Sequence, residues 1–252
     1  MDDPETLDDA ELKILPGSRS PLGPDRVVPR GRHGHPREEI RNVHRARLLD
    51  AFVVAVGRAR YDATRVVDVC HLAGVSNRAF YATFADKEDC YLAAFDLGSR
   101  LLIDRSTEAY RSAEGPWEQQ LAEGVGTALR YLAANPPFAR FCTVEVSHVG
   151  PAAVARLNAV IGELRRAFGG DGEPNVPESL HGEPIESLLI GAAIRPIFTY
   201  IEDGRVTRLP ELAPQLVEFM IFVVLGGGGC QAGAGSGGPT PLFPAHSALP
   251  PV

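Results

Sequence analysis

Residues 73–84 contain the side chains in this sequence that are best suited to binding chemistry. Asn77 and Arg78 stand next to each other there, and both can form paired hydrogen bonds with base edges, the amide with adenine and the guanidinium with guanine. Ala82 and Thr83 follow at a spacing that is expected to turn them to the same outward side. This combination predicts recognition of DNA.

Motifs for catalysis are not evident in the chain. The sequence holds no GxSxG, HExxH or glycine-rich phosphate loop. Glu145 and His148 stand three residues apart and would supply only one side of a metal site. The protein is therefore predicted not to be an enzyme, and neither a metal nor another cofactor is expected.

Signals on both sides of the polar stretch place it on a helix-turn-helix. One helix is predicted to end at Ala73, Gly74 to make the tight turn, and Ser76 to cap a second helix over 76–84. Phe80 and Phe84, four residues apart, would anchor that second helix to the core. In proteins with this motif the second helix enters the major groove of DNA.

The charge is distributed unevenly along the chain. The net charge is −7 over 252 residues, but residues 26–84 carry 11 Lys/Arg against 5 Asp/Glu. The flanking segments, 1–25 and 85–252, are both acidic. A basic segment between acidic ones is typical of a DNA-binding module on an acidic body.

The remaining pattern is helical and predicts an all-α protein of about nine helices. Thr64 is expected to cap the helix that ends at Ala73, Asp86 to cap the helix after the polar stretch, and Pro196 to kink a late helix. Low-complexity ends and a Gly/Pro-rich stretch at 169–177 read as disordered or mobile. The expected helices cover 38–57, 64–73, 76–84, 86–113, 117–135, 138–149, 151–168, 179–203 and 209–225.

Cysteine usage and the start of the sequence indicate the compartment. The four cysteines lie far apart without a CxxC pair, which suits a reducing environment. Met1 is followed by acidic residues and not by the apolar core of a signal peptide. The longest strongly apolar run, 219–225, is too short to span a bilayer. A cytoplasmic location without membrane association is expected.

Residues 64–95 resemble the TetR family of bacterial transcription regulators. The family pattern T-x-x-x-D-[IV]-x-x-x-A-G-V-S-x-x-x-[LF]-Y-x-x-F-x-x-K-[ED] is matched without a gap. Beyond residue 95 the resemblance rests on length and helical pattern alone. The matching residues are Thr64, Asp68, Val69, Ala73, Gly74, Val75, Ser76, Phe80, Tyr81, Phe84, Lys87 and Glu88.

The resemblance implies a set of DNA contacts. Tyr81 and Lys87 match the family's phosphate contacts, although a core tyrosine and an ordinary solvated lysine are the alternatives. Arg78 and Ala79 depart from the family's usual residues, which leaves the operator sequence open. The expected DNA-binding residues are Thr64, Ser76, Asn77, Arg78, Ala79, Tyr81, Ala82, Thr83 and Lys87.

A basic arm precedes the first predicted helix. Four Pro and Gly residues deny residues 26–37 a helix, and the arginines there could reach phosphates or a minor groove. A soluble linker with incidental charge is the alternative interpretation. The arm residues expected to contact DNA are Arg30, Arg32 and Arg37.

The resemblance also implies a homodimer, because the last two helices of such proteins form a bundle with those of a second subunit. The last predicted helix is apolar on most sides, which favours burial in an interface, whereas burial within one subunit is the alternative. A symmetric dimer would bind a palindromic operator. The dimerisation candidates are Leu188, Ala192, Leu212, Leu216, Phe219, Met220 and Val223.

In the family, the middle helices enclose a ligand and pass its effect to the DNA-binding helices. Aromatic and polar residues of the middle helices are the candidates, and their mixture suits a small hydrophobic effector with a few polar groups. Each is also readily explained as plain core or surface. The candidates are Trp117, Tyr131, Phe141, Glu145, His148 and Phe198.

Together these observations predict a ligand-responsive dimeric transcription regulator, most simply a repressor that its ligand releases from a DNA operator. A regulator whose body binds a protein partner or no ligand is the first alternative, and a helical carrier or enzyme the second. The expected division is a disordered tail at 1–36 with the basic arm at 26–37, a DNA-binding domain at 37–85, an effector-binding and dimerisation domain at 86–225, and a disordered tail at 226–252.

Overall fold

The computed structural model describes residues 16–18, 20–22, 37–168 and 183–225. These residues form ten α-helices and one 3-10 helix and contain no strand, which confirms the all-α prediction. The expectations for the basic arm before residue 37, the loop at 169–177 and the C-terminal tail lie outside the described residues. The helices are α2 (Arg37–Ala59), α3 (Val66–Ala73), α4 (Asn77–Tyr81), α5 (Lys87–Ser112), α6 (Trp117–Ala134), α7 (Pro136–Thr143), α8 (Val146–Val149), α9 (Pro151–Phe168), α10 (Glu183–Glu202), η3 (Val206–Leu212) and α11 (Ala213–Leu225).

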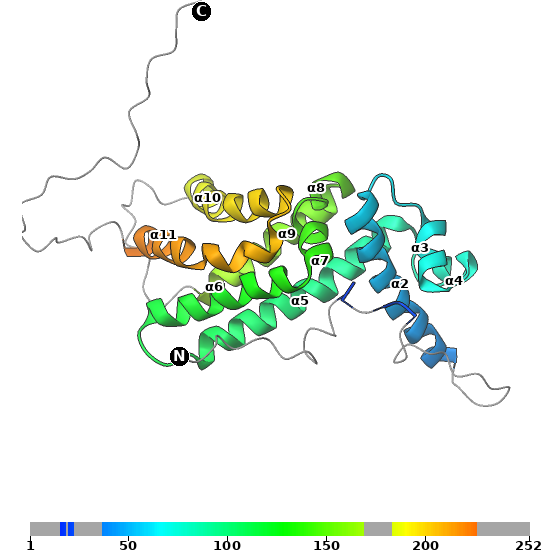
Figure 1. The fold of residues 1–252 in the computed structure, drawn as a ribbon, viewed down its shortest axis with the longest axis horizontal. Helices are drawn as coiled ribbons and strands as arrows, with labels where there is room; N and C mark the ends of the chain where they lie inside the picture. Colours follow the sequence, from blue (N-terminus) through cyan, green and yellow to red (C-terminus); the bar gives the residue numbers. More distant parts are fainter. Residues whose placement is uncertain (1–15, 19, 23–36, 169–182, 226–252) are drawn as a thin grey trace, which may run out of the picture.

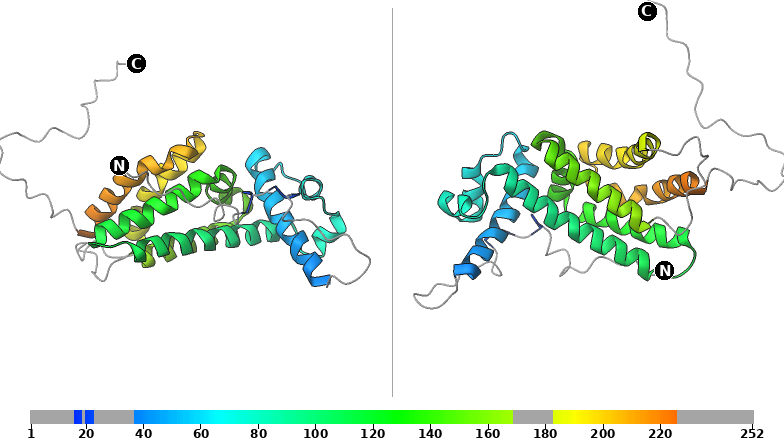
Figure 2. Two further views of the ribbon diagram at one scale, coloured as in Figure 1. Left: turned by 60° about the horizontal axis from the view of Figure 1, so that its bottom comes forward. Right: turned by 180° about the vertical axis from the view of Figure 1, so that it is seen from behind.

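The helices form a small head and a larger body. Helices α2, α3 and α4 lie at one end of the molecule, and the long helix α5 runs from that end along the body beside α6 (Figure 1). Helix α9 covers α5 on the far side, where the view from behind shows it crossing the body (Figure 2). Helices α10 and α11 lie on the opposite side, with η3 and α11 against α6.

Short capping motifs fix where the head helices end. Gly74 closes α3 in the left-handed conformation at φ 61°, which favours glycine, and its N–H donates to the last carbonyls of that helix. Ser76 Oγ then accepts the N–H of Ala79, and Asp86 accepts the N–H of Asp89 at 2.8 Å. The Asp89 carboxylate in turn accepts the N–H of Ala85, the residue before the cap, at 2.9 Å. Both predicted caps are confirmed.

The predicted cap at Thr64 is wrong. Arg65 occupies the N-cap of α3, and no side chain accepts a hydrogen bond from that helix end. The Thr64 hydroxyl instead donates to the carbonyl of Arg60 at 2.8 Å, and Thr64 is buried. Its side chain therefore closes the turn after α2 and does not begin α3.

Three predicted helices have other bounds. The second helix of the predicted helix-turn-helix is only Asn77–Tyr81. The helix expected over 138–149 breaks into α7 and α8, because the N–H of Glu145 bonds to Arg140 five residues back. The last predicted helix begins as the 3-10 helix η3, which contains Pro210, and becomes α-helical only at Ala213.

Part of the N-terminal segment is packed on the head, although the sequence predicted disorder there. The N–H of Gly17 donates to the buried carboxylate of Asp50 on α2 at 3.0 Å. Asn135, between α6 and α7, donates its amide to the carbonyl of Pro16 at 3.2 Å. Residues 16–18 therefore bridge the head and the body.

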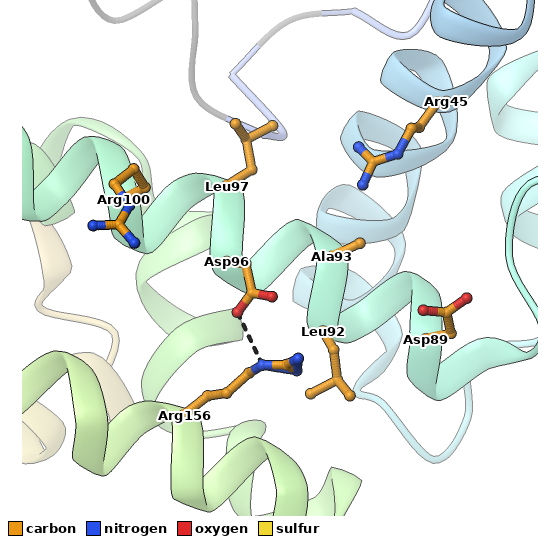
Figure 3. Close-up of a pocket in the computed structure, with 8 residues that line it drawn as sticks. All are labelled: Arg45, Asp89, Leu92, Ala93, Asp96, Leu97, Arg100 and Arg156. Atoms are coloured by element: carbon orange, nitrogen blue, oxygen red, sulfur yellow. Dashed lines mark ion pairs between the residues drawn. The ribbon is translucent and has the colours of Figure 1, made fainter.

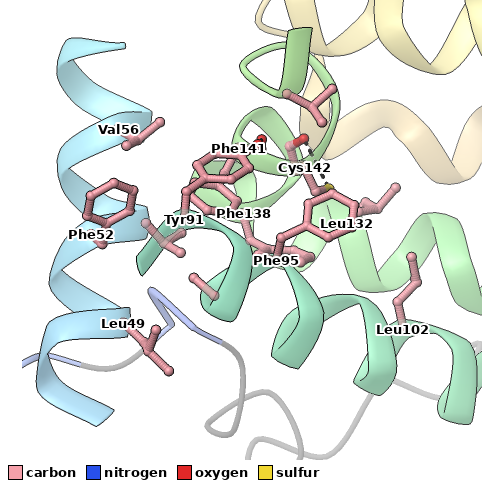
Figure 4. Close-up of a cluster of buried hydrophobic side chains, with 14 of the residues drawn as sticks. Leu49, Phe52, Val56, Tyr91, Phe95, Leu102, Leu132, Phe138, Phe141 and Cys142 are labelled. Carbon is pink, nitrogen blue, oxygen red and sulfur yellow. Dashed lines mark hydrogen bonds between the residues drawn. The ribbon is translucent and has the colours of Figure 1, made fainter. Parts of the chain in front are cut away.

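The core is continuous from head to body through an aromatic cluster (Figure 4). Tyr91 of α5 stacks on Phe141 of α7 with ring centroids 4.1 Å apart, and its hydroxyl donates to the Phe141 carbonyl. Phe52 of α2 meets both rings edge-on. Cys90 and Cys142 are buried in the same core, where desolvation raises the pKa of both thiols. Among the described residues no helix is long and apolar enough to cross a bilayer.

Gly98 lies so close to Phe138 of this cluster that a larger residue at position 98 should destabilise the protein. An added Cβ at Gly98 would overlap the fully buried ring of Phe138. We expect Gly98→Ala to lower the free energy of unfolding by about 1–3 kcal/mol, measured by urea denaturation. The control is Gly162→Ala on α9, whose Cβ would meet only the end of the Arg166 side chain at 3.5 Å. That change should be neutral or should stabilise by up to about 1 kcal/mol. Equal stability of both variants would contradict this packing.

Candidate nucleic-acid interface

Helix α4 separates anchoring side chains from exposed ones. Phe80 and Phe84 are buried against the head core, as predicted. Asn77, Arg78 and Ala82 are exposed, so the amide and the guanidinium are both available to a partner. The helix therefore presents hydrogen-bonding groups from a rigid support.

Tyr81 lies on the exposed side of α4. Its side chain is 59% exposed and meets Phe80 edge-on with ring centroids 5.3 Å apart. The alternative of a core tyrosine is thereby excluded. Contact with Phe80 orients the ring and leaves the hydroxyl accessible, as a contact to a phosphate requires.

Three other predicted contact residues are less accessible. Ala79 and Thr83 are half-buried, and the Thr83 hydroxyl donates to the carbonyl of Ala79 at 2.8 Å. The expectation that Thr83 faces fully outward is therefore wrong. Thr64 is buried with its hydroxyl proton directed to Arg60, so in this conformation it has none to donate to a phosphate. Ser76 is exposed, and its oxygen caps α4.

Lys87 makes internal contacts at the start of α5. Its Nζ donates to the carbonyl of Tyr61 at 3.0 Å and lies 3.4 Å from that of Thr64. The same ammonium stands 4.0 Å from the centroid of the Tyr61 ring, a cation–π contact. Lys87 thus ties α5 to the turn after α2, and the alternative of a free solvated lysine does not hold.

The sequence interpretation overlooked Arg65. This residue is exposed at the start of α3, where its guanidinium binds both carboxylate oxygens of Asp68, at 2.8 and 2.9 Å. The hydrogen bond raises the pKa of Arg65 and lowers the pKa of Asp68. The three-residue spacing of the two charges in the sequence is the signal that would have revealed the pair. Arg37 begins α2 but its side chain is not described, and Arg30 and Arg32 lie outside the described residues.

The six ligand-binding candidates have different surroundings. Trp117 is half-buried and donates from Nε1 to the carbonyl of Phe168 at 2.9 Å. Tyr131 is buried and donates to the carbonyl of Gly98, and Phe141 belongs to the aromatic cluster. Phe198 lies half-buried on α10.

Glu145 and His148 have different surroundings. Glu145 is completely buried at the break between α7 and α8, where it faces the head. His148 is exposed on α8. The two residues therefore do not share a site, although they are three apart in sequence.

An open cleft of about 540 Å³ lies between α2, α5 and α9 (Figure 3). Arg156 spans it to Asp96 with Nε and Oδ1 3.0 Å apart. Burial raises the pKa of the Asp96 carboxyl, and Arg156 and Arg100 oppose that shift. None of the six ligand candidates lines this cleft, whose residues are Arg45, Asp89, Leu92, Ala93, Asp96, Leu97, Arg100 and Arg156.

Two buried hydroxyls on α5 have no hydrogen-bond partner within the part of the chain that the structure describes. They belong to Ser106, which is completely buried, and to the neighbouring Thr107. An unpartnered buried hydroxyl costs about 1–3 kcal/mol, so its presence in the body needs a reason. Sequence analysis missed both residues because it considered only aromatic and strongly polar side chains.

The dimerisation candidates divide into two groups. Leu212 and Leu216 are buried within the subunit, so for them the alternative of burial inside one chain holds. Phe219 and Met220 are half-buried and Ala192 is exposed. The side chains of Leu188 and Val223 are not described. Phe222, which was not among the candidates, is 64% exposed on α11.

Several solved structures superpose on this chain, among them three transcription regulators. The regulator FadR from Bacillus subtilis, in complex with stearoyl-CoA, superposes with a TM-score of 0.58 at 18% identity, over 71% of this chain and 97% of that one. The fatty acid degradation regulator FadR from Bacillus halodurans gives 0.58 at 18% identity, over 73% and 98%. A TetR family transcription regulator from Marinobacter aquaeolei VT8 gives 0.53 at 21% identity, over 71% and 97%.

These similarities show the fold. No model of a protein family matches the sequence, and no curated protein matches it significantly. The superpositions include nearly all of each neighbour, so the shared architecture extends over head and body together. The chain therefore has the fold of TetR-like regulators, as its sequence motif indicated.

The contacts of Lys87 predict a measurable effect without DNA. Lys87→Ala removes a charged donor from the Tyr61 carbonyl together with the cation–π contact. We expect a loss of about 1–3 kcal/mol in the free energy of unfolding, measured by chemical denaturation. Arg78→Ala, which removes an exposed cation from α4, should change it by less than about 0.5 kcal/mol. If Lys87→Ala is as stable as Arg78→Ala, these contacts of Lys87 do not support the fold.

Proposed function

We propose that this protein is a homodimeric transcription regulator that binds operator DNA through α4 and is released by a small hydrophobic ligand held in its body. The observation that carries the proposal is that α4 is anchored by buried Phe80, with Phe84 buried just after the helix, while Asn77, Arg78 and Tyr81 of α4 are exposed. The fold shared with transcription regulators supports the same conclusion.

The exposed residues of α4 are suited to two different kinds of DNA contact, with bases and with phosphates. Arg78 is suited to a bidentate contact with guanine and Asn77 to one with adenine, so these two would specify sequence. Tyr81 would donate to a phosphate and fix the register of the head. Arg65, exposed at the N-terminal end of α3, would add a cation that its partner Asp68 holds in place.

Two copies of α10 and α11 are proposed to form the dimer interface. Phe222 is 64% exposed, and Phe198, Phe219 and Met220 are only half-buried in the single subunit. Exposed apolar surface of this kind is costly in water and favours association. A two-fold dimer would place two copies of α4 on a palindromic operator.

The body offers a place for a ligand with a polar group. Ser106 and Thr107 hold buried hydroxyls without partners, which a bound ligand would satisfy. The neighbour from Bacillus subtilis is described in complex with stearoyl-CoA, so a long-chain acyl-CoA is the first ligand to examine. Helix α5 carries both hydroxyls and also begins six residues after Tyr81, which gives a ligand there a direct connection to α4.

A role as repressor follows from this connection. A ligand that binds one arrangement of α5 better than another shifts the population of head positions by its difference in affinity. Loss of the DNA-binding arrangement would then release the operator. The other classes, a regulator whose body binds a protein and a helical carrier or enzyme, have no comparable observation in their favour.

DNA binding is tested on α4. An operator is selected from random double-stranded DNA with the full chain, and affinity is measured by fluorescence anisotropy at several salt concentrations. Arg78→Ala should weaken operator binding by about 1–3 kcal/mol and relax the preference at one base position, whereas Tyr81→Phe should weaken all sequences about equally.

The control for this test is Arg166→Ala, which removes an exposed cation from the body helix α9. It should leave both affinity and sequence preference unchanged. If selection enriches no DNA, the proposed function is wrong. If Arg78→Ala keeps the wild-type preference, α4 is not the reading element.

Ligand binding is tested at Ser106. Without ligand, Ser106→Ala should raise the free energy of unfolding by about 1 kcal/mol, because an unpartnered buried hydroxyl is removed. Saturating stearoyl-CoA should raise the melting temperature of the wild type, since it binds only the folded state, and should raise that of Ser106→Ala less. Ser112→Ala, on the exposed last turn of α5, serves as the control. Equal ligand shifts in all three proteins would remove Ser106 from the site.

A further inference from the structure

The turn between α2 and α3 is held from two sides at Tyr61. On one side, Lys87 of α5 donates to its carbonyl at 3.0 Å, and the Tyr61 ring packs edge-on against Tyr91 with centroids 5.5 Å apart. On the other side, the N–H of Tyr61 donates to Glu145 Oε2 at 2.9 Å. Glu145 stands at the break between α7 and α8, so the second contact comes from the body.

Burial of Glu145 at this position carries a large desolvation cost. Its carboxylate is completely buried, and removing such a charge from water costs several kcal/mol. Arg140 on α7 lies 3.1 Å from Oε1 and Arg60 from the head lies 3.8 Å from it, which compensates the charge. Among the described residues Oε1 accepts no well-aligned hydrogen bond. Oε1 is therefore engaged by the two arginine charges, and Oε2 accepts the N–H of Tyr61. Loss of the carboxylate would leave the Tyr61 N–H and Arg140 without this partner.

The geometry of the turn is adapted to this carboxylate. Arg60 takes the left-handed conformation at φ 71°, which costs a residue with a side chain about 1 kcal/mol or more. This conformation immediately precedes the N–H that Glu145 accepts. The helix break at Glu145, where α7 ends and its N–H bonds five residues back, is the counterpart on the body. The two backbone segments, the turn at Arg60 and Tyr61 and the break at Glu145, thus both depart from regular helix where they meet.

The polar contact differs in kind from the apolar contacts around it. Phe52, Tyr91 and Phe141 join head and body by packing, which is not directional and permits small rotations. A hydrogen bond to a buried carboxylate weakens steeply when its angle changes. With α5 as one attachment and Glu145 as the other, the head is held at two points, and its rotation about the start of α5 is opposed.

We propose that Glu145 is a positioning residue that sets the orientation of the DNA-binding head and thereby the half-site spacing that the dimer accepts. This inference rests on the proposed function. In a dimer, the angle of each head relative to its body fixes the distance and the rotation between the two copies of α4. A head that turns more freely tolerates more than one spacing.

The experiment compares operators that differ only between their half-sites. The operator selected with the wild-type full chain is lengthened by two base pairs, which displaces one half-site by about 7 Å and rotates it by about 70°. The measured quantity is the ratio of the affinity for the original operator to the affinity for the lengthened one. For the wild type we expect this ratio to be at least about 10. For Glu145→Ala we expect it to be less than about 3. Glu163→Ala is the control, because its carboxylate pairs with Arg100 between α9 and α5, on the surface of the body and away from the head, at 3.3 Å. It should keep the wild-type ratio.

Two further measurements separate this role from general destabilisation. Hydrogen exchange of the Tyr61 amide should accelerate in Glu145→Ala and stay unchanged in Glu163→Ala. Glu145→Gln retains an oxygen for the Tyr61 N–H and loses the charge, so it should fold and show a ratio between those of the wild type and of Glu145→Ala. If Glu145→Ala does not fold, the Gln variant decides by the same ratio. A folded Glu145 variant with the full wild-type ratio overturns the inference, whereas failure to select any operator with the wild type overturns the proposed function instead.

Discussion

Tyr91 packs against both parts of the molecule at once. Its ring stacks on Phe141 of the body and meets Phe52 and Tyr61 of the head edge-on, while its hydroxyl donates to the Phe141 carbonyl. Desolvation in this position raises the pKa of Tyr91, so the hydroxyl keeps its proton and remains a donor. The residue lies close to the Asp86 cap, within the first turns of α5. Helix α5 therefore cannot shift in the body without also moving the end that adjoins α4, and every proposal made for the site depends on that coupling.

The parts of the fold that follow from neighbouring residues could be predicted from the sequence. Ser76 and Asp86 cap helices because a short polar side chain meets an N–H three residues on, and Phe80 and Phe84 are buried because four residues make about one helical turn. Glu145 could not be placed in this way, because its partner Tyr61 is 84 residues distant. Thr64 was misassigned because two hydrogen-bonding options for its hydroxyl, a helix end and the Arg60 carbonyl, look alike in sequence. Ser106 gave no signal, since a missing partner is a property of packing and not of residue type.

The net charge of −7 does not reveal two different roles of charged residues in this chain. The excess of basic over acidic residues lies in 26–84, before α5, whereas acidic residues are in excess in 1–25 and 85–252. An acidic body is repelled by the phosphate backbone, so contacts with DNA through any surface other than the head are disfavoured. Inside the molecule, Lys87 and Glu145 instead form hydrogen bonds with the backbone of Tyr61 and so connect separate segments of the chain. In the proposed function, the first kind of charge would select the surface that meets DNA, and the second would hold that surface in place.

The head has no interior that is complete without the body. Phe52 is fully buried only because Phe141 and Tyr91 cover it, and Asp50 faces a backbone N–H from the N-terminal segment that Asn135 of the body also holds. Such a unit does not behave as an exchangeable module. Over evolutionary time, a change on the covered face of α2 must be matched by changes on α5 and α7, so recombination at the boundary near residue 85 would join surfaces that do not fit. If α4 reads DNA as proposed, new operator preferences would be more readily acquired through Asn77, Arg78 and Ala82, which are exposed and carry none of this packing.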